Sequence, residues 1–414
     1  MKQTAYYVLG LLFTINLINY LDRQVLYSLL PLIKTDLQLS DRELGALASA
    51  FMIVYMCAAP FIGYWADRST RKNWIAYGIG IWSVATFASG LARGYGQLFA
   101  ARAAVGIGES GYGSVSPSFV AEHFTAEKRG RVLAFFSMAI PVGSALGYIC
   151  GGWIGYHYGW RTAFMVVGLP GLLLACLAYR LRDPRRPSAA SGKPLPRFRD
   201  YLSLYRIPSY VASTLAMAAL TFALGGLAVW MPTFLNRYWG LNVAQAGTLF
   251  GGITVVAGLI GSLAGGWLGD RLLKVTGKAY FIVSGAGLIL ALPAGVIAIL
   301  SSWYPLTLTA LFVTEVLVFL NMGPLNGVIV NVTSAPMRSM AFAANIFVIH
   351  ALGDALSPTL IGIVSDLWGL RLGLIGAMLF LGLAGLFCLW GARVVEQDTR
   401  RIAVEEDSLA EAAA

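Results

Sequence analysis

The sequence predicts an all-α integral membrane protein with twelve transmembrane helices in two pseudo-symmetric six-helix bundles. Three observations predict this fold class: an apolar composition, apolar stretches of membrane-spanning length, and a repeat between the two halves. Hydrophobic residues make up 57% of the 414 residues and charged residues only 12%, whereas roughly a quarter of a soluble domain is charged. A core in water cannot hold this much apolar surface, so a lipid environment is required.

The apolar stretches have the length that a bilayer demands. A hydrocarbon layer about 30 Å thick is crossed by about 20 mostly apolar residues in a helix. The first stretch contains Asp22 and Arg23 and lacks a small-residue cleavage site, so we expect a retained helix and not a signal peptide. The expected spans are residues 5–31, 44–66, 74–92, 96–122, 132–156, 161–181, 208–236, 244–269, 279–301, 304–331, 341–365 and 370–393.

The basic residues fall mainly on one side of these spans. With a cytoplasmic amino terminus, 22 Lys and Arg lie in inner segments and six in outer ones. Such a bias places both termini in the cytoplasm. The net charge of +10 therefore reflects membrane topology and does not indicate nucleic-acid binding. The protein is therefore expected to be a multi-pass membrane protein.

A polar segment divides the chain. Residues 182–206 are rich in Pro, Ser and Arg and separate six spans from six, which is typical of a linker. The predicted domains are an amino-terminal bundle at 1–181, a cytoplasmic linker at 182–206, a carboxy-terminal bundle at 207–395 and a cytoplasmic tail at 396–414. The four cysteines lie in apolar spans without CxxC or Cys/His spacing, so we expect no disulfide, metal or cofactor.

The two halves share loop motifs. The motif GYWADRSTRK at 63–72 resembles GGWLGDRLLK at 265–274. A shift of 203 residues superposes Gly63 on Gly266, Asp67 on Asp270 and Arg68 on Arg271. EKRGR at 127–131 and PMRSMA at 336–341 occupy corresponding loops later in each half. Such duplication predicts a substrate site near mid-membrane where the halves meet.

The first of these loops resembles the cytoplasmic loop motif of the major facilitator superfamily. The glycine allows helices to approach closely, and the Asp and Arg can pair in one conformational state and separate in another. A plain charged loop is the alternative reading. The residues expected to form this conformational latch are Gly63, Asp67, Arg68, Arg71, Arg129, Asp270, Arg271 and Arg338.

A narrower resemblance spans nearly the whole chain. NYLDR at 19–23, RAAVGIGESGYGSVSP at 102–117, IPVGSALGYICGG at 140–152 and HALGDALSPTLIG at 350–362 are similar to segments of the Spinster family of transporters. The resemblance implies alternating access and transport of lysophospholipids or sphingosine phosphate-like lipids, in eukaryotic relatives by export or proton-linked efflux. The very short termini differ from those relatives and look bacterial.

Four charged residues fall inside the amino-terminal spans. A charge at the centre of a helix costs about 2.5–3.5 kcal/mol on insertion scales, so each one suggests a function. Arg102 and Glu109 are seven residues apart and share a helical face. Since the superfamily fold places spans one and four along the central cavity, Arg23 and Arg102 are assigned to an anionic headgroup, and Asp22 and Glu109 to proton exchange. A static network of buried ion pairs is the alternative.

The carboxy-terminal spans carry further polar residues near mid-depth. Glu315 and Asn321 lie in span ten, and His350 and Asp354 in span eleven. Glu315, Asn321 and His350 are expected to contribute to substrate binding. His350 is either a protonation gate or a neutral packed histidine, and Asp354, on the same helix face, is expected to support it.

These features favour a transporter over other classes. The Gly106-Ile107-Gly108 run lies inside a membrane span, not after a strand, so it does not indicate a nucleotide loop, and we expect no enzyme activity. A proton-coupled carrier of small organic anions or drugs would use the same charged residues. A transporter-like membrane sensor is the alternative from a different class. The expected partners are an amphipathic lipid or organic anion, protons and the bilayer, with the protein as a monomer.

Overall fold

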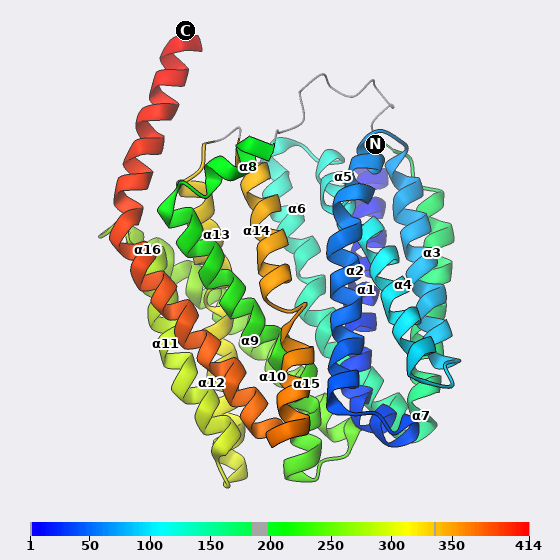
Figure 1. The fold of residues 1–414 in the computed structure, drawn as a ribbon. Coiled ribbons are helices and arrows are strands. Elements are labelled where there is room, and N and C mark those ends of the chain that lie inside the picture. Colours follow the sequence, from blue (N-terminus) through cyan, green and yellow to red (C-terminus); the bar gives the residue numbers. More distant parts are fainter. Residues whose placement is uncertain (1, 184–197, 335–336, 414) are drawn as a thin grey trace. The chain divides into compact units, whose positions relative to one another are not determined.

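The computed structural model describes residues 2–183, 198–334 and 337–413, and every regular element in these ranges is an α-helix (Figure 1). The helices of the first half are α1 Lys2–Leu37, α2 Asp41–Asp67, α3 Arg71–Gly90, α4 Tyr95–Gly113, α5 Ser116–Glu122, α6 Ala126–Ser137 and α7 Ala139–Tyr179. Next come α8 Phe198–Leu204, inside the predicted linker, α9 Pro208–Trp239, α10 Val243–Leu273, α11 Ala279–Leu300, α12 Tyr304–Phe319, α13 Met322–Asn331, α14 Arg338–Leu352, α15 Ser357–Trp368 and α16 Leu370–Ala413.

The predicted twelve-span fold is confirmed, but several spans are interrupted. Span four is α4 with α5, span ten is α12 with α13, and span eleven is α14 with α15. A proline lies among the first three residues after each break, at Pro117, Pro324 and Pro358. Proline lacks the donor of the i to i−4 hydrogen bond and clashes with the preceding turn, so each helix restarts there.

Hydropathy alone identifies fewer spans. Within the described residues, eight helical segments are long and apolar enough to cross a membrane, and one of them, Lys128–Tyr179, contains both span five and span six. Gly159, with φ of 83°, separates these two spans, because glycine tolerates the left-handed region. Spans one, three and four, formed by α1, α3 and by α4 with α5, are not among these segments.

The chain forms two compact units. Unit 1 contains Met1–Lys193, Ala228–Val255 and Pro358–Leu367, and unit 2 contains Pro194–Leu227, Val256–Ser357 and Trp368–Ala414. Unit 1 therefore includes segments of α9, α10 and α15 beside the helices of the first half.

Unit 1 is built on close helix pairs. Its α1 packs along α7, α3 packs on α7 and α4, and α2 packs on α4. Gly143 permits the first of these contacts: a Cβ there would lie 2.5 Å from the Leu17 carbonyl oxygen. Small residues let helix backbones approach in this way in membranes.

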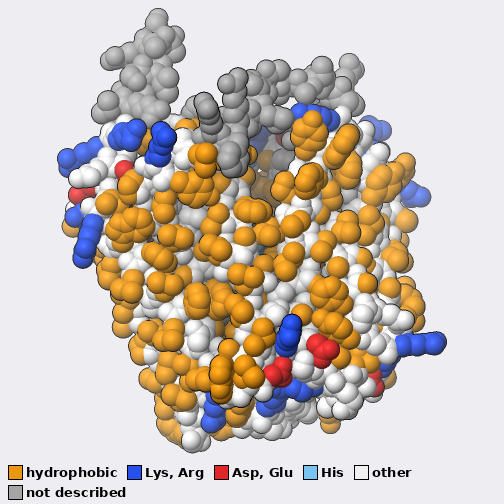
Figure 2. All heavy atoms as spheres, viewed as in Figure 1, with side chains coloured by type: hydrophobic (Ala, Val, Ile, Leu, Met, Phe, Trp, Pro, Cys, Tyr) orange, Lys and Arg blue, Asp and Glu red, His pale blue; other side chains and the backbone are white. Residues whose placement is uncertain are grey.

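In unit 2, α11 packs against α16, α12 and α13. The 44-residue α16 is about 66 Å long at about 1.5 Å per residue, and in Figure 1 it continues past the end of α11, its neighbour. Hydrophobic side chains cover the visible sides of both units, while Lys and Arg gather toward the helix ends (Figure 2). Phe61 and Leu263 are 70% and 73% exposed, as lipid-facing side chains should be.

Candidate functional site

Helices α1 and α4 bring four charged residues into unit 1. Asp22 and Arg23 follow one another on α1 and therefore point in different directions, whereas Arg102 and Glu109 lie two turns apart on one face of α4. The result is two ion pairs, Arg23 with Glu109 and Asp22 with Arg102. The four residues assigned from the sequence thus lie in one region of the bundle.

The first pair is short and partly accessible. Arg23 Nε donates to Glu109 Oε2 at 2.5 Å. The Arg23 side chain is 14% exposed, while that of Glu109 is 0% exposed. The guanidinium carbon of Arg23 lies 4.9 Å, 4.9 Å and 5.1 Å from the ring centroids of Tyr20, Phe51 and Tyr55. Rings at such distances attract a cation and also present apolar surface.

The second pair is fully buried. Arg102 Nη1 lies 3.5 Å from Asp22 Oδ1, and both side chains are at most 2% exposed. Thr86 of α3 also donates a hydrogen bond to Asp22 Oδ2. Among the described residues, Arg102 Nε and Nη1 have no hydrogen-bond partner. The guanidinium therefore keeps donors for which the described protein supplies no acceptor.

The polar residues predicted in the second half lie in unit 2. Glu315 is 1% exposed and its Oε1 has no hydrogen-bond partner among the described residues. The Asn321 amide donates to the Leu317 carbonyl oxygen at 2.9 Å. His350 Nδ1 lies 2.8 Å from Asp354 Oδ1. In the described ranges, no hydrogen bond or ion pair joins Glu315 to Asn321, His350 or Asp354, so these residues form no single cluster comparable to that of unit 1.

The predicted latch residues of the first half have partners within unit 1. Arg71 is 2% exposed and bonds Glu122 at 2.5 Å and Asp183 at 3.3 Å. Arg68 donates to the Tyr64 carbonyl oxygen at 3.1 Å and its guanidinium lies over the Tyr64 ring. Gly63 is half-buried, and the side chain of Asp67 lies outside the described residues.

Two arginines show the repeat between the halves in atomic detail. Arg129 Nε donates to the carbonyl oxygens of Ala121 and Phe124, which lie eight and five residues earlier. Arg338 Nε donates to those of Val330 and Thr333, at the same spacings. Each arginine thereby satisfies carbonyl groups at the end of a helix that precedes it.

The remaining latch residues, Asp270 and Arg271, lie in unit 2 at the end of α10. Asp270 accepts a hydrogen bond from the Tyr280 hydroxyl at 3.0 Å. The Arg271 guanidinium lies 5.2 Å from the Trp267 ring centroid. Both side chains thus have neighbours within unit 2.

A second charged cluster in unit 1 was not anticipated from the sequence. Asp41 is 2% exposed, and its carboxylate accepts from Arg237 Nη1 and Nη2 at 2.5 Å and from Lys34 Nζ at 2.5 Å. Ser365 also donates to it. We call Lys34, Asp41, Arg237, Ser365 and Asp366 the α2 clasp, because they join the start of α2 to segments of α9 and α15.

The clasp also caps α2. The Asp366 carboxylate accepts from the backbone N–H groups of Asp41 and Arg42, both at 2.8 Å, where the helix dipole favours a negative charge. Ser40 and Glu43 form a capping box there. The Ser-x-x-Glu spacing is the signal that marks this helix start in the sequence, but it does not reveal the partners from α9 and α15.

Another ion pair lies near the clasp in the chain. Asp36, beyond the predicted span at 5–31, accepts from Arg161 at 2.6 Å. This hydrogen bond, with a weaker one from Trp160, lowers the pKa of the Asp36 carboxyl below its usual range. The carboxylate is thus held charged at neutral pH.

Comparison with known proteins identifies the family. The model of the Major Facilitator Superfamily matches residues 12–358. Protein spinster homolog 1 of Xenopus tropicalis is 36% identical over 380 residues, which cover 86% of this chain and 72% of the relative. The corresponding human protein is 33% identical, with 87% and 72% coverage. Protein spinster of Drosophila melanogaster is 32% identical, with 88% of this chain and 62% of the fly protein covered.

Solved structures share the fold. A bacterial homolog to the human lysosomal transporter Spinster, in an inward-facing and unoccupied conformation, superposes with a TM-score of 0.87 at 23% identity, covering 96% of this chain and 99% of that one. The human organic anion transporter MFSD10 superposes with a TM-score of 0.66 at 16% identity, with 93% and 99% coverage. The family predicted from the sequence is confirmed: this chain is a multi-pass membrane transporter of the major facilitator superfamily and belongs to its Spinster family.

Proposed function

We propose that this secondary transporter moves an anionic amphipathic lipid, of the lysophospholipid or sphingosine phosphate class, in a proton-linked cycle. The observation that carries the proposal is the Arg23–Glu109 pair, in which a partly exposed cation is bonded to a buried carboxylate. The similarity to known proteins gives the transporter family, and the lipid and the proton are our inference from the residues.

Arg23 is the proposed first contact for the anionic headgroup. It is more exposed than the other three charged residues of the cluster, and a planar guanidinium donates paired hydrogen bonds to phosphate. The rings of Tyr20, Phe51 and Tyr55 around it suit a ligand in which a charge adjoins apolar carbon. Arg102, whose Nε and Nη1 have no hydrogen-bond partner among the described residues, is proposed to bind the same headgroup.

The proposed proton coupling arises because the headgroup replaces Glu109 as the partner of Arg23. A headgroup that takes Arg23 leaves the Glu109 carboxylate buried without its counter-ion, and burial of an unpaired charge is costly. Uptake of a proton removes that cost, so substrate binding and protonation of Glu109 favour each other. Asp22, held by Arg102 and Thr86, is proposed to take part in the same exchange.

The second half is proposed to contribute to the substrate site as well. Glu315 offers a buried carboxylate oxygen with no partner among the described residues. Asn321 and His350 are proposed to contact the substrate, and the Asp354 hydrogen bond orients the His350 ring. The proposed domains remain two bundles, 1–181 and 207–395, joined by the 182–206 linker.

Alternating access requires contacts that form and break at both membrane faces. We propose that the α2 clasp closes the outer face, because positive charge is enriched on the other side of the predicted spans. The latch residues of the Gly63–Lys72 and Gly265–Lys274 loops are proposed to act at the cytoplasmic face. Both termini are proposed to be cytoplasmic, in the inner membrane of a bacterium.

The test is lipid flux in proteoliposomes. Fluorescent lysophospholipid and a sphingosine phosphate analogue are followed with and without an imposed pH gradient. We expect flux in the wild type, a loss of about tenfold or more in Arg23→Ala and Arg102→Ala, and partial flux in Arg23→Lys, since Lys keeps the charge but not the planar fork. Glu109→Gln is expected to transport without responding to the pH gradient.

Arg42→Ala is the matched control, because Arg42 is an exposed arginine at the start of α2, outside the cluster. Each variant is first compared with the wild type by size-exclusion chromatography and thermal unfolding. A folded wild type that moves small organic anions and no lipid would contradict the lipid assignment and favour the small-anion carrier.

A further inference from the structure

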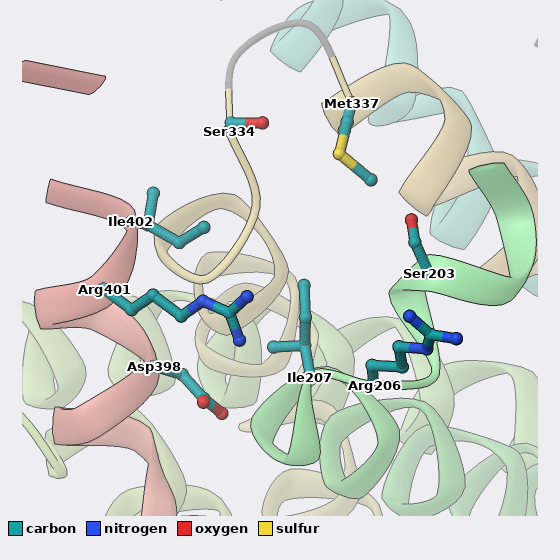
Figure 3. A pocket seen from close by; sticks show the side chains of 8 residues that line it. All are labelled: Ser203, Arg206, Ile207, Ser334, Met337, Asp398, Arg401 and Ile402. Atoms are coloured by element: carbon teal, nitrogen blue, oxygen red, sulfur yellow. The ribbon is translucent and has the colours of Figure 1, made fainter. Parts of the chain in front are cut away.

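Unit 2 contains a cavity of about 250 Å³ that lies apart from the residues discussed above. Arg206 and Ile207 just before α9 form one wall, and Asp398, Arg401 and Ile402 of α16 form another. Figure 3 shows the Arg401 side chain extending from α16 toward Ile207, and the Arg206 side chain extending on the other side of Ile207, toward Ser203. The lining is completed by Ser203 of α8, Ser334 after α13 and Met337 before α14.

The arginines of this cavity are available for a ligand. Neither the Arg206 nor the Arg401 side chain makes a hydrogen bond or ion pair within the parts of the chain that the structure describes, and both are exposed. The carboxylate that shares the cavity is already engaged: Asp398 Oδ2 accepts from the Ser209 N–H at 2.9 Å and the Ser209 hydroxyl at 2.6 Å. The cavity therefore presents two free cations against one carboxylate that caps α9.

The size and surroundings of the cavity limit which ligands it can bind. A volume of 250 Å³ lies below the roughly 300–1,000 Å³ typical of pockets for drug-sized molecules, so a headgroup fits and a whole lipid does not. Leu202 and Tyr205, which flank Ser203 and Arg206 in the chain, are 49% and 46% exposed. Exposed apolar and tyrosine side chains beside a cationic cavity are typical of the membrane interface.

We propose that this cavity binds a phosphate ester through Arg206 and Arg401. Two guanidinium groups from different elements can each donate paired hydrogen bonds to phosphate oxygens. The ligand would thereby join the start of α9 to α16. The chemistry is shared by an anionic phospholipid headgroup and a soluble phosphate compound, and the test separates these two sources.

The experiment uses the full-length protein in detergent. Native mass spectrometry counts bound phosphatidylglycerol and phosphatidylcholine, and thermal unfolding is measured with inorganic phosphate and glycerol 3-phosphate. The variants are Arg206→Gln, Arg401→Gln and the double variant. Arg400→Gln is the matched control, since Arg400 is an exposed arginine next to Arg401 that does not line the cavity.

We expect the wild type and Arg400→Gln to retain phosphatidylglycerol in preference to phosphatidylcholine, and the double variant to bind it about tenfold more weakly. If only the soluble phosphate compounds stabilise the wild type, and the double variant loses this stabilisation, the cavity binds a soluble phosphate compound and not a lipid headgroup. The proposed site is then still supported. Equal behaviour of the wild type and the double variant toward every phosphate compound would overturn the proposal. A loss of phosphate binding in Arg400→Gln equal to that in the double variant would also overturn the proposal.

Discussion

Arg23 and Arg102 lie in the same unit but have different surroundings, and this difference separates their roles. Arg23 is partly exposed and bonded to Glu109, whereas Arg102 is buried beside Asp22. The spacing of Arg102 and Glu109 along a helix predicts that they share a face. Which carboxylate each arginine pairs with depends on how α1 packs against α4, and a single sequence holds no signal for that.

Asp22 and Arg102 are expected to be energetically coupled. Removing one partner of a buried ion pair costs about 3–5 kcal/mol because the other charge is left unpaired. Asp22→Asn and Arg102→Gln should each destabilise the protein strongly, and the double variant should be more stable than the sum of the singles by about 1–3 kcal/mol. Thermal unfolding in detergent measures this cycle.

The control for this cycle combines Asp22→Asn with Arg42→Gln, whose effects are expected to add because Arg42 lies on another helix near its start. Strict additivity of the Asp22 and Arg102 variants would show that the two side chains do not interact.

At the scale of elements, the sequence predicts where helices occur better than where they break. The twelve apolar stretches predict the spans, because the thickness of the bilayer sets the length of a helix that crosses it. The breaks in spans four, ten and eleven follow from Pro117, Pro324 and Pro358, so the sequence does contain a signal for them. The α2 clasp could not be foreseen, because Asp41, Arg237 and Ser365 are far apart in the chain and only the fold unites them.

The clasp is expected to hold its end of unit 1 closed. Asp41→Ala leaves Lys34 and Arg237 without their shared carboxylate, so like charges face each other. In a background without cysteines, Ser49→Cys reports on this region, since the Ser49 hydroxyl accepts a hydrogen bond from Thr359 of α15. Labelling by a membrane-impermeant maleimide should be about tenfold faster with Asp41→Ala, a change of about 1.4 kcal/mol.

Arg42→Ala serves as the control, because its exposed side chain lies outside the clasp while its backbone N–H remains bonded to Asp366. Equal labelling rates with and without Asp41 would mean that the carboxylate does not restrain this end.

At the scale of the whole molecule, the protein is a Spinster-family transporter, in which we propose that a substrate that takes Arg23 favours protonation of Glu109. The membrane class was predictable because the bilayer dictates an apolar composition and the length of each span, whereas the family was indicated by the resemblance of four sequence segments. The substrate was not predictable, because the charges of Arg23, Arg102 and Glu109 suit several anions. The function must therefore be established by measuring the movement of the substrate and of protons together.

The most direct measurement is therefore proton movement driven by substrate. Wild-type and Glu109→Gln proteins are placed in liposomes that contain a pH-sensitive dye, and lysophospholipid is added on one side without an imposed pH gradient. If substrate binding favours proton binding, proton binding favours substrate binding equally. We therefore expect a change of internal pH with the wild type and none with Glu109→Gln. Lipid flux through the wild type with no change of internal pH would contradict the proton-linked mechanism.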